Sequence, residues 1–297
     1  MQKLGQLTCG SEQSETGLRY LVVLPTRLRY APMRMVDIHC HILPGLDDGP
    51  DSLDMSLEMA EMAVADGITH VVATPHANSQ YRFIPEMVRS RRDEVQARLG
   101  DRLLFATGCD FHLSYENLQE VHENPPKYTL NQKTYLLIEF ADFALPPSID
   151  ETLHRLQLAG LQPIITHPER NPLIRAQPGR LLRWVRQGCY AQVTAQSLLG
   201  RFGPTAKHAV MNWLDQGAIH FVASDAHNVT TRPMKLKDAF ERVAERNGEQ
   251  VADALFRANP LAAFEGRSLP YVPETAEVEP ATQAPRLAGR RKRFWFF

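Results

Sequence analysis

Two histidines separated by one residue close the first apolar run of the chain, which reads Val-Asp-Ile-His39-Cys40-His41. Because side chains alternate along a strand, both imidazoles face one side and Cys40 faces the other. Two ring nitrogens at one strand end can chelate a divalent metal ion. A pair of surface histidines would give the same pattern, so the interpretation depends on residues further along the chain.

Further potential metal ligands stand at the ends of later apolar runs. The second, third, fourth, fifth and seventh runs end, respectively, in His76, Asp110, Glu139, His167 and the pair Asp225 and His227. A single histidine after an apolar run is usually structural, but six strand ends with ligand chemistry predict a metal site. Imidazole and carboxylate without thiolate suit Mn, Fe or Zn, and the number of ligands predicts two or three ions.

Charged residues beside these ligands predict a substrate that carries phosphate. Arg170 follows His167 closely, and Arg232 follows the seventh run. A guanidinium matches phosphate oxygens with two parallel donors, although a surface salt bridge between Arg170 and Glu169 is the alternative. The turn 47–50, Asp-Asp-Gly-Pro, adds two carboxylates near the same edge, unless it serves only as a turn before a helix.

The other histidines receive no role in the predicted site. They fall in helical segments or in the middle of strands: His70, His122, His154, His208 and His220. His112 differs, because it lies two residues after Asp110 on the same strand and therefore faces the same side. It can contact a metal ligand without binding the metal itself.

The elements that must position these residues follow a repeated pattern. An amphipathic helical segment, a glycine and a short apolar run recur at Gly67, Gly160, Gly188 and Gly217. With the runs around residues 38, 106 and 137, this gives about seven strands separated by helical or loop segments. The pattern predicts an α/β fold of a single domain, in which parallel strands form a barrel-like (β/α) arrangement with its chemistry at the carboxyl ends of the strands.

Composition excludes some classes of partner. The 297 residues carry a formal net charge of −1, which does not indicate nucleic-acid binding and favours a protein or small-molecule substrate. The four cysteines are far apart and form no C-x-x-C pair, so we expect a reducing cytoplasm. The apolar stretch 21–25 is too short to span a bilayer.

Three segments are expected along the chain. Residues 1–34 form an N-terminal extension, disordered or created by a misassigned start, and residues 35–268 form the catalytic domain. Residues 269–297 are rich in Pro and Glu and predict a disordered linker. The linker ends in a basic and aromatic tail at 289–297, which is either a solvated end without a role or a contact for an anionic membrane surface or a partner.

Six short motifs together resemble the PHP (polymerase and histidinol phosphatase) superfamily. They are D-I-H-C-H, L-D-D-G-P, A-T-P-H, L-I-E-F, T-H-P-E-R and A-S-D-A-H-N. The set is most similar to the bacterial capsule-type manganese-dependent tyrosine phosphatases, in order and without large gaps over residues 35–248.

The resemblance implies the PHP fold, a distorted (β/α)7 TIM-like barrel in a single domain, with a centre of three metal ions, most suitably Mn²⁺. By motif position its ligands are His39, His41, His76, Asp110, Glu139, His167, Asp225 and His227. Asp48 matches an acidic residue of the D-D-G-P loop, and Arg170 and Arg232 match the phosphate-binding arginines. Asp110 departs from the family pattern, which usually has Glu, so its ligation stays open.

The resemblance also implies the reaction and the partner. A metal-activated water attacks the phosphorus of phosphotyrosine, with Asp48 as the candidate general acid. The implied substrate is a tyrosine autokinase that controls capsule or exopolysaccharide synthesis. The native metal, the oligomeric state and the physiological substrate are not fixed by the sequence.

Three alternatives stay open. A cysteine-dependent phosphatase needs H-C-x5-R, but the sixth residues after the four cysteines are Glu15, Leu46, Tyr115 and Ala195, so none has its arginine. A histidinol-phosphate phosphatase or another small-molecule phosphoesterase would use the same cluster. A non-catalytic metal-binding regulatory module would keep the ligands but would not need the two arginines.

Overall fold

The computed structural model describes residues 34–277 of the chain. The expected extension 1–34, apart from its last residue, and the basic and aromatic tail at 289–297 lie outside the described residues. In the part of the chain that the structure describes, no helix is long and apolar enough to cross a membrane.

The described strands form two sheets in which every neighbouring pair is parallel. In chain order they are β1 (Met35–Cys40), β2 (Ile68–Ala73), β3 (His76–Ala77), β4 (Leu104–Thr107), β5 (Asp110–His112), β6 (Tyr135–Glu139), β7 (Gln162–Thr166), β8 (Tyr190–Thr194) and β9 (Phe221–Ala223). One sheet has the order β1-β2-β4, and the other has the order β3-β5-β6-β7-β8-β9. The predicted α/β class with parallel strands is confirmed.

Two of the seven predicted strands are each divided in two. The second run splits into β2 and β3 around Thr74 and Pro75, because proline has no N–H to donate to a sheet. The third run splits into β4 and β5 around Gly108 and Cys109. As a result, His76 and Asp110 begin short strands of the second sheet, whereas the sequence placed them at strand ends.

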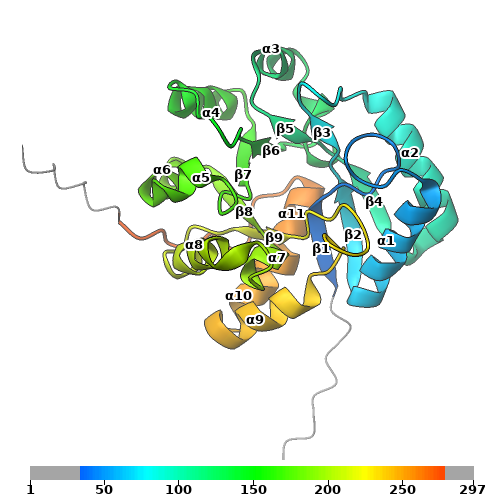
Figure 1. Ribbon diagram of the computed structural model, residues 1–297. Coiled ribbons are helices and arrows are strands. Elements are labelled where there is room, and N and C mark those ends of the chain that lie inside the picture. Colours follow the sequence, from blue (N-terminus) through cyan, green and yellow to red (C-terminus); the bar gives the residue numbers. More distant parts are fainter. Residues whose placement is uncertain (1–33, 278–297) are drawn as a thin grey trace, which may run out of the picture. The chain divides into compact units, whose positions relative to one another are not determined.

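The sheets meet between β1 and the segment after β9. Cys40 and Ala226 form a parallel bridge, the Asp225 N–H donates to the His39 carbonyl at 2.8 Å, and the His41 N–H donates to the Ala226 carbonyl at 2.8 Å. These bonds place the first and last strands of the chain side by side. The predicted distorted barrel is thereby confirmed (Figure 1).

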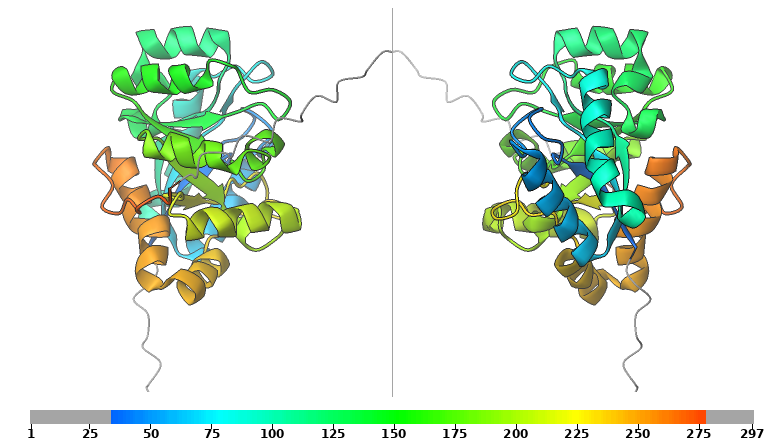
Figure 2. Two further views of the ribbon diagram at one scale, coloured as in Figure 1. Left: turned by 90° about the vertical axis from the view of Figure 1, so that its left-hand side faces the viewer. Right: turned by 90° about the vertical axis from the view of Figure 1, so that its right-hand side faces the viewer.

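Helices surround the strands in all views (Figure 2). They are α1 (Leu53–Asp66), α2 (Pro85–Leu99), α3 (Tyr115–Glu123), α4 (Ile149–Leu158), α5 (Pro172–Arg175), α6 (Pro178–Arg186), α7 (Ala195–Leu198), α8 (Gly203–Asp215), α9 (Lys237–Asn247), α10 (Glu249–Asp253) and α11 (Asn259–Glu265). Ser52 caps α1 by accepting from the Met55 N–H, and Gly67 ends it with a left-handed φ of 91°. The predicted sequence of helix, glycine and strand is thus present at this connection.

The apolar core fills the amino ends of the strands, and polar residues lie at the carboxyl ends. A buried cluster joins Val36, Leu137, Ile164 and Phe221 of different strands to Ala263 of α11. The Tyr135 hydroxyl donates to the Arg267 carbonyl just after α11, so α11 lies near the amino end of β6. Apolar packing therefore fills the amino ends, and the carboxyl ends remain for the predicted ligands.

The described part of the expected linker is packed against the domain. The Tyr271 N–H donates to Asn259 Oδ1 at 3.1 Å, Thr275 Oγ1 donates to the Gly217 carbonyl at 3.0 Å, and the Ala276 N–H donates to the Gln216 carbonyl at 2.9 Å. Residues 271, 275 and 276 thus have hydrogen-bond partners in the domain, while the boundary at residue 268 stays a prediction.

Candidate metal centre

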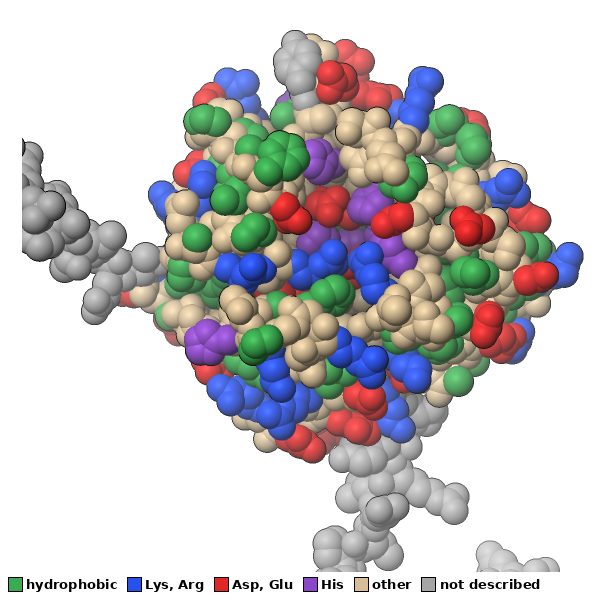
Figure 3. Space-filling model, viewed as in Figure 1, with side chains coloured by type: hydrophobic (Ala, Val, Ile, Leu, Met, Phe, Trp, Pro, Cys, Tyr) green, Lys and Arg blue, Asp and Glu red, His purple; other side chains and the backbone are tan. Residues whose placement is uncertain are grey.

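The predicted ligands gather at the carboxyl ends of the strands. Histidine and acidic side chains occupy the middle of this face, with a band of basic side chains beside them (Figure 3). Three overlapping groups place one ligand atom of each member within 4.8 Å of the others: His41, Asp48, His76 and His227; His39, His41 and Asp110; and His76, Asp110 and Glu139. Their overlap at three shared residues suits several adjacent ions better than one.

The two remaining predicted ligands border these groups. Asp225 Oδ1 lies 3.5 Å from Nε2 of His39 and 3.5 Å from Nε2 of His41. His167 Nε2 lies 3.7 Å from Glu139 Oε1. The structure therefore brings all eight predicted ligands into one cluster, together with Asp48.

Asp110 faces the cluster despite being shorter than the family glutamate. Its Oδ2 lies 3.5 Å from His39 Nε2 and 3.3 Å from His76 Nδ1. Asp110 starts β5 and pairs with Leu137 of β6, which sets the backbone close to the cluster. A carboxylate one methylene shorter consequently still reaches the other ligands.

Hydrogen bonds at Nδ1 fix the direction of three imidazoles. His39 Nδ1 lies 2.9 Å from Gln192 Oε1, and His41 Nδ1 lies 2.7 Å from Asp47 Oδ2. His227 Nδ1 lies 3.0 Å from the Asp225 carbonyl. With each Nδ1–H donated in this way, Nε2 presents its lone pair to the cluster, as in protein metal sites.

Sequence reasoning missed the supporting roles of Gln192 and Asp47. Gln192 belongs to β8, the one run that had no predicted ligand, and its amide is buried between the apolar residues Ala191 and Val193. That polar residue was the available signal. Asp47 was grouped with Asp48, but it holds the loop by accepting from the N–H groups of Gly49 at 3.0 Å and His76 at 3.1 Å.

The loop 47–50 requires its glycine. A Cβ on Gly49 would lie 2.5 Å from the His41 carbonyl oxygen, which is closer than real Cβ contacts. Because the loop must approach β1 this closely to bring Asp47 against His41, the D-D-G-P motif has a steric basis.

Two candidate ligands have unusual backbone conformations. His167 follows β7 with φ of 30°, and Asp225 follows β9 with φ of 50°. Non-glycine residues seldom adopt positive φ, and such residues concentrate at functional sites where the surrounding structure holds them. Both turns direct a side chain into the cluster.

The carboxylates of the cluster raise the pKa values of several neighbouring groups. Burial lowers the pKa of His39, but Asp110 and Asp225 outweigh burial and raise it to about 9. Burial likewise opposes protonation of His76, yet the neighbouring carboxylates of Asp110 and Asp48 raise its pKa to about 11. Burial and the Asp110 charge raise the pKa of Glu139 to about 8. These shifts indicate a field that favours bound cations.

Several ligand atoms have no hydrogen-bond partner among the described residues. They are both carboxylate oxygens of Asp110, His76 Nδ1 and His227 Nε2. Unpaired buried polar atoms are costly, so their convergence points to a bound group. Imidazole nitrogens and carboxylate oxygens fit divalent metal ions.

Asp48 suits metal binding better than proton donation. Its Oδ1 lies 3.4 Å from His76 Nε2 and 3.3 Å from His227 Nε2. Partial burial opposes ionisation, but the neighbouring imidazoles of His227 and His76 hold the pKa of Asp48 well below its usual range. A carboxylate oxygen this close to two imidazole nitrogens is placed to share a metal ion with them, which favours metal binding over the predicted general-acid role.

The two predicted arginines lie beside the cluster. Arg170 forms an ion pair with Asp225 Oδ2, and Arg232 contacts the same oxygen at 2.5 Å. The alternative, a surface salt bridge between Arg170 and Glu169, is not the main contact of Arg170. Glu169 is buried and accepts a hydrogen bond from the Thr194 N–H at 2.9 Å. Two guanidinium groups next to a metal site are well placed for phosphate oxygens.

The described cysteines do not suit nucleophilic catalysis. Cys40, Cys109 and Cys189 are free and buried. Burial raises the pKa of Cys40 and Cys109 well above the ordinary thiol value, which disfavours the thiolate.

Comparison with known proteins places this arrangement in a family. The family model for capsular polysaccharide synthesis, CpsB/CapC, matches residues 35–265. The tyrosine-protein phosphatase YwqE of Bacillus subtilis is 36% identical over 89% of this chain and 100% of its own length. The putative tyrosine-protein phosphatase CapC of Staphylococcus aureus is 35% identical over 69% of this chain and 82% of its own.

Solved structures agree with the sequence comparison. A structure from the study of YwqE of Bacillus subtilis and CpsB of Streptococcus pneumoniae, described as unique metal-dependent tyrosine phosphatases, has a TM-score of 0.77 and 34% identity. It covers 83% of this chain and 100% of the solved chain. A lactonase of Listeria monocytogenes, 12% identical with a TM-score of 0.51, shares only the fold. The predicted resemblance is confirmed: the chain belongs to the CpsB/CapC family of capsular polysaccharide synthesis.

Proposed function

We propose that this chain is a metal-dependent phosphatase that hydrolyses phosphotyrosine in proteins. The observation that carries the proposal is the cluster of imidazoles and carboxylates with two guanidinium groups at its edge. The names of the relatives YwqE, CapC and CpsB support a tyrosine-protein phosphatase in particular.

We assign metal binding to nine residues. They are His39, His41, Asp48, His76, Asp110, Glu139, His167, Asp225 and His227. The three overlapping groups support two or three ions, and Mn²⁺ fits this mixture of nitrogen and oxygen ligands, with Fe or Zn as alternatives. Asp48 joins the ligands in place of its expected role as an acid.

Metal ions bound here would lower the pKa of a coordinated water and withdraw charge from the phosphoryl oxygens. Arg170 and Arg232 bind the remaining oxygens and offset the charge that develops in the transition state. Both arginines contact Asp225, so a bound phosphate would share them with that carboxylate. Gln192 and Asp47 keep the imidazoles turned toward the cluster.

The assignment of Asp48 to metal binding favours an aryl phosphate as substrate. A tyrosyl group leaves as a phenolate with a pKa of about 10, and it needs less help from an acid than an alkoxide does. Asp48, the expected acid, is assigned to metal binding with His76 and His227 instead of to proton donation. An enzyme built in this way is suited to phosphotyrosine.

The physiological substrate that we propose is a tyrosine autokinase of capsule or exopolysaccharide export. The match to the family of capsular polysaccharide synthesis supports it. We place the protein in the cytoplasm, where the described cysteines would persist as free thiols.

Metal analysis coupled to activity tests the proposal. The purified chain should contain divalent metal, lose activity toward a phosphotyrosine peptide after chelation and regain it with Mn²⁺. Histidinol phosphate should be a much poorer substrate. A preference for histidinol phosphate would favour the small-molecule alternative, and no turnover of either substrate would favour a non-catalytic metal-binding module.

The arginines separate catalysis from metal binding. Replacing both Arg170 and Arg232 with alanine should lower kcat/KM by at least about a hundredfold, the usual cost of losing one preorganised charge-stabilising group. Metal content should change little. Arg155→Ala, which removes an exposed pair with Glu151, is the control and should keep full activity. Undiminished activity of the double variant would refute this substrate site.

A further inference from the structure

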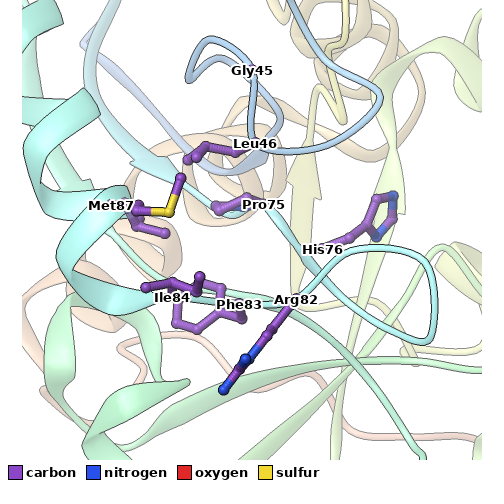
Figure 4. Close-up of a pocket in the computed structure, with 9 residues that line it drawn as sticks. Gly45, Leu46, Pro75, His76, Arg82, Phe83, Ile84 and Met87 are labelled. Carbon is purple, nitrogen blue, oxygen red and sulfur yellow. The ribbon is translucent and has the colours of Figure 1, made fainter.

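A small pocket adjoins the proposed metal centre. It has a cavity volume of about 70 Å³ and is lined by Gly45, Leu46, Pro75, His76, Arg82, Phe83, Ile84, Met87 and Val88. Leu46, Pro75, Phe83 and Met87 gather around one space, with the His76 ring at its edge (Figure 4).

The pocket is built from the same loops as the metal centre. Leu46 lies two residues before Asp48, and Pro75 directly precedes His76. His76 belongs to both places, since its Nε2 lies 3.4 Å from Asp48 and its Nδ1 lies 3.3 Å from Asp110. A group held in the pocket would therefore stand next to a phosphate on the metals.

The lining combines apolar side chains with polar atoms, so it suits a group that has an apolar body and a polar end. Phe83 and Val88 are buried, while the Met87 side chain is 45% exposed at the mouth. Arg82 is the one cationic side chain of the lining apart from His76, and it is exposed. The volume is far below the range of several hundred Å³ that larger ligands occupy, which suits a single side chain.

We propose that this pocket binds the aromatic ring of the substrate phosphotyrosine and thereby sets the preference for aryl over alkyl phosphates. The proposal rests on the phosphatase function proposed above. In phosphotyrosine one oxygen joins the ring to phosphorus, so the ring must lie directly beside the phosphate. A small pocket that shares His76 with the metal centre and is lined by Leu46, Pro75 and Phe83 meets this requirement.

Met87 offers the sharpest test, because it is half exposed on α2 and lines the pocket without belonging to the buried core. Met87→Ala should raise KM for a phosphotyrosine peptide and the inhibition constant of phenylphosphonate by about three- to tenfold, as expected for part of an apolar contact. Inhibition by inorganic phosphate, which has no ring, should stay unchanged. Met87→Leu should restore the wild-type constants.

Leu104→Ala is the matched control. Leu104 is 44% exposed at the start of β4, near the amino ends of the strands, and its loss should change none of these constants. Weakened binding of the peptide alone would assign the pocket to a neighbouring residue of the substrate and overturn the proposal, as would Met87→Ala constants equal to wild type. Wild-type protein that neither hydrolyses the peptide nor responds to phosphate would refute the phosphatase function itself.

Discussion

The orientation of His39 and His41 depends on residues that are not themselves assigned as ligands. Gln192 accepts from His39, and Asp47 accepts from His41, both at Nδ1. The alternation of His39 and His41 along a strand was visible in the sequence, because it has a period of two. The hydrogen-bond partner of His39 lies 153 positions away along the chain, and no periodic pattern in the sequence indicates such a distant contact.

Gln192→Met should weaken metal binding by about ten- to hundredfold, which is the usual effect of losing the hydrogen-bond partner of a metal-binding histidine. The substitution keeps the length of the side chain and removes the acceptor, so His39 loses its fixed direction. Gln162→Met is the control, since Gln162 donates to Thr134 at the amino end of β7. Metal titration of the stripped protein measures the difference; equal affinities in both variants would show that Gln192 does not position His39.

The strands and their connections set the site as much as the ligands do. The sequence identified seven apolar runs and their parallel order, because glycine and helical periodicity mark each connection. It did not identify the breaks at Pro75 and Gly108, which transfer His76 and Asp110 to the second sheet. Gly108 is confined by Leu130, whose Cδ2 would lie 2.8 Å from an added Cβ, and this packing is a tertiary effect.

One connection between elements also predicts a dependence of stability on pH. His220 precedes β9, and its Nδ1 accepts from the Ala191 N–H of β8 at 3.3 Å, while Asn259 of α11 donates to its carbonyl at 3.0 Å. Burial lowers the pKa of His220 from 6.5 to about 4. Between these values the unfolded chain binds more protons than the folded chain, so stability falls as pH decreases from 6.5 to 4.

The loss from this one group is at most about 3.5 kcal/mol, since one pKa unit corresponds to about 1.4 kcal/mol. His220→Gln keeps an acceptor for Ala191 and should flatten the pH dependence over that window. His208→Gln, at an exposed position of α8, should leave the slope as it is in the wild type. Denaturant unfolding of the metal-free proteins at several pH values measures the slopes; a His220→Gln slope equal to that of wild type would contradict the assignment.

The barrel is closed by contacts between segments that lie far apart in the sequence. The bond from the Asp225 N–H to the His39 carbonyl joins the first strand to the segment after the last one. The repeated helix and strand pattern predicted the barrel, whereas composition predicted a linker from residue 269, because Pro, Glu, Ala and Thr are common there. Composition gives no information on individual contacts, such as the hydrogen bonds that Tyr271 and Thr275 form with the domain. We propose that the domain extends to about residue 277.

Truncation at two positions tests this boundary. A chain of residues 1–277 should unfold at the same denaturant concentration as the full chain. A chain of residues 1–268 should lose about 2–4 kcal/mol, since it loses several hydrogen bonds worth about 1 kcal/mol each. Equal stability of all three chains would return the boundary to residue 268.

Gly217 provides an independent measurement of the same contact. Its φ is 65°, and a Cβ at this position would collide with the Glu274 carbonyl oxygen. Gly217→Ala therefore costs backbone strain in every chain, but it adds a steric clash only where residue 274 is present. The substitution should destabilise the full chain more than the chain of residues 1–268, and the difference isolates the packing of the segment from the strain of the turn. An equal cost in both chains would mean that residues 269–277 do not press against Gly217 in solution.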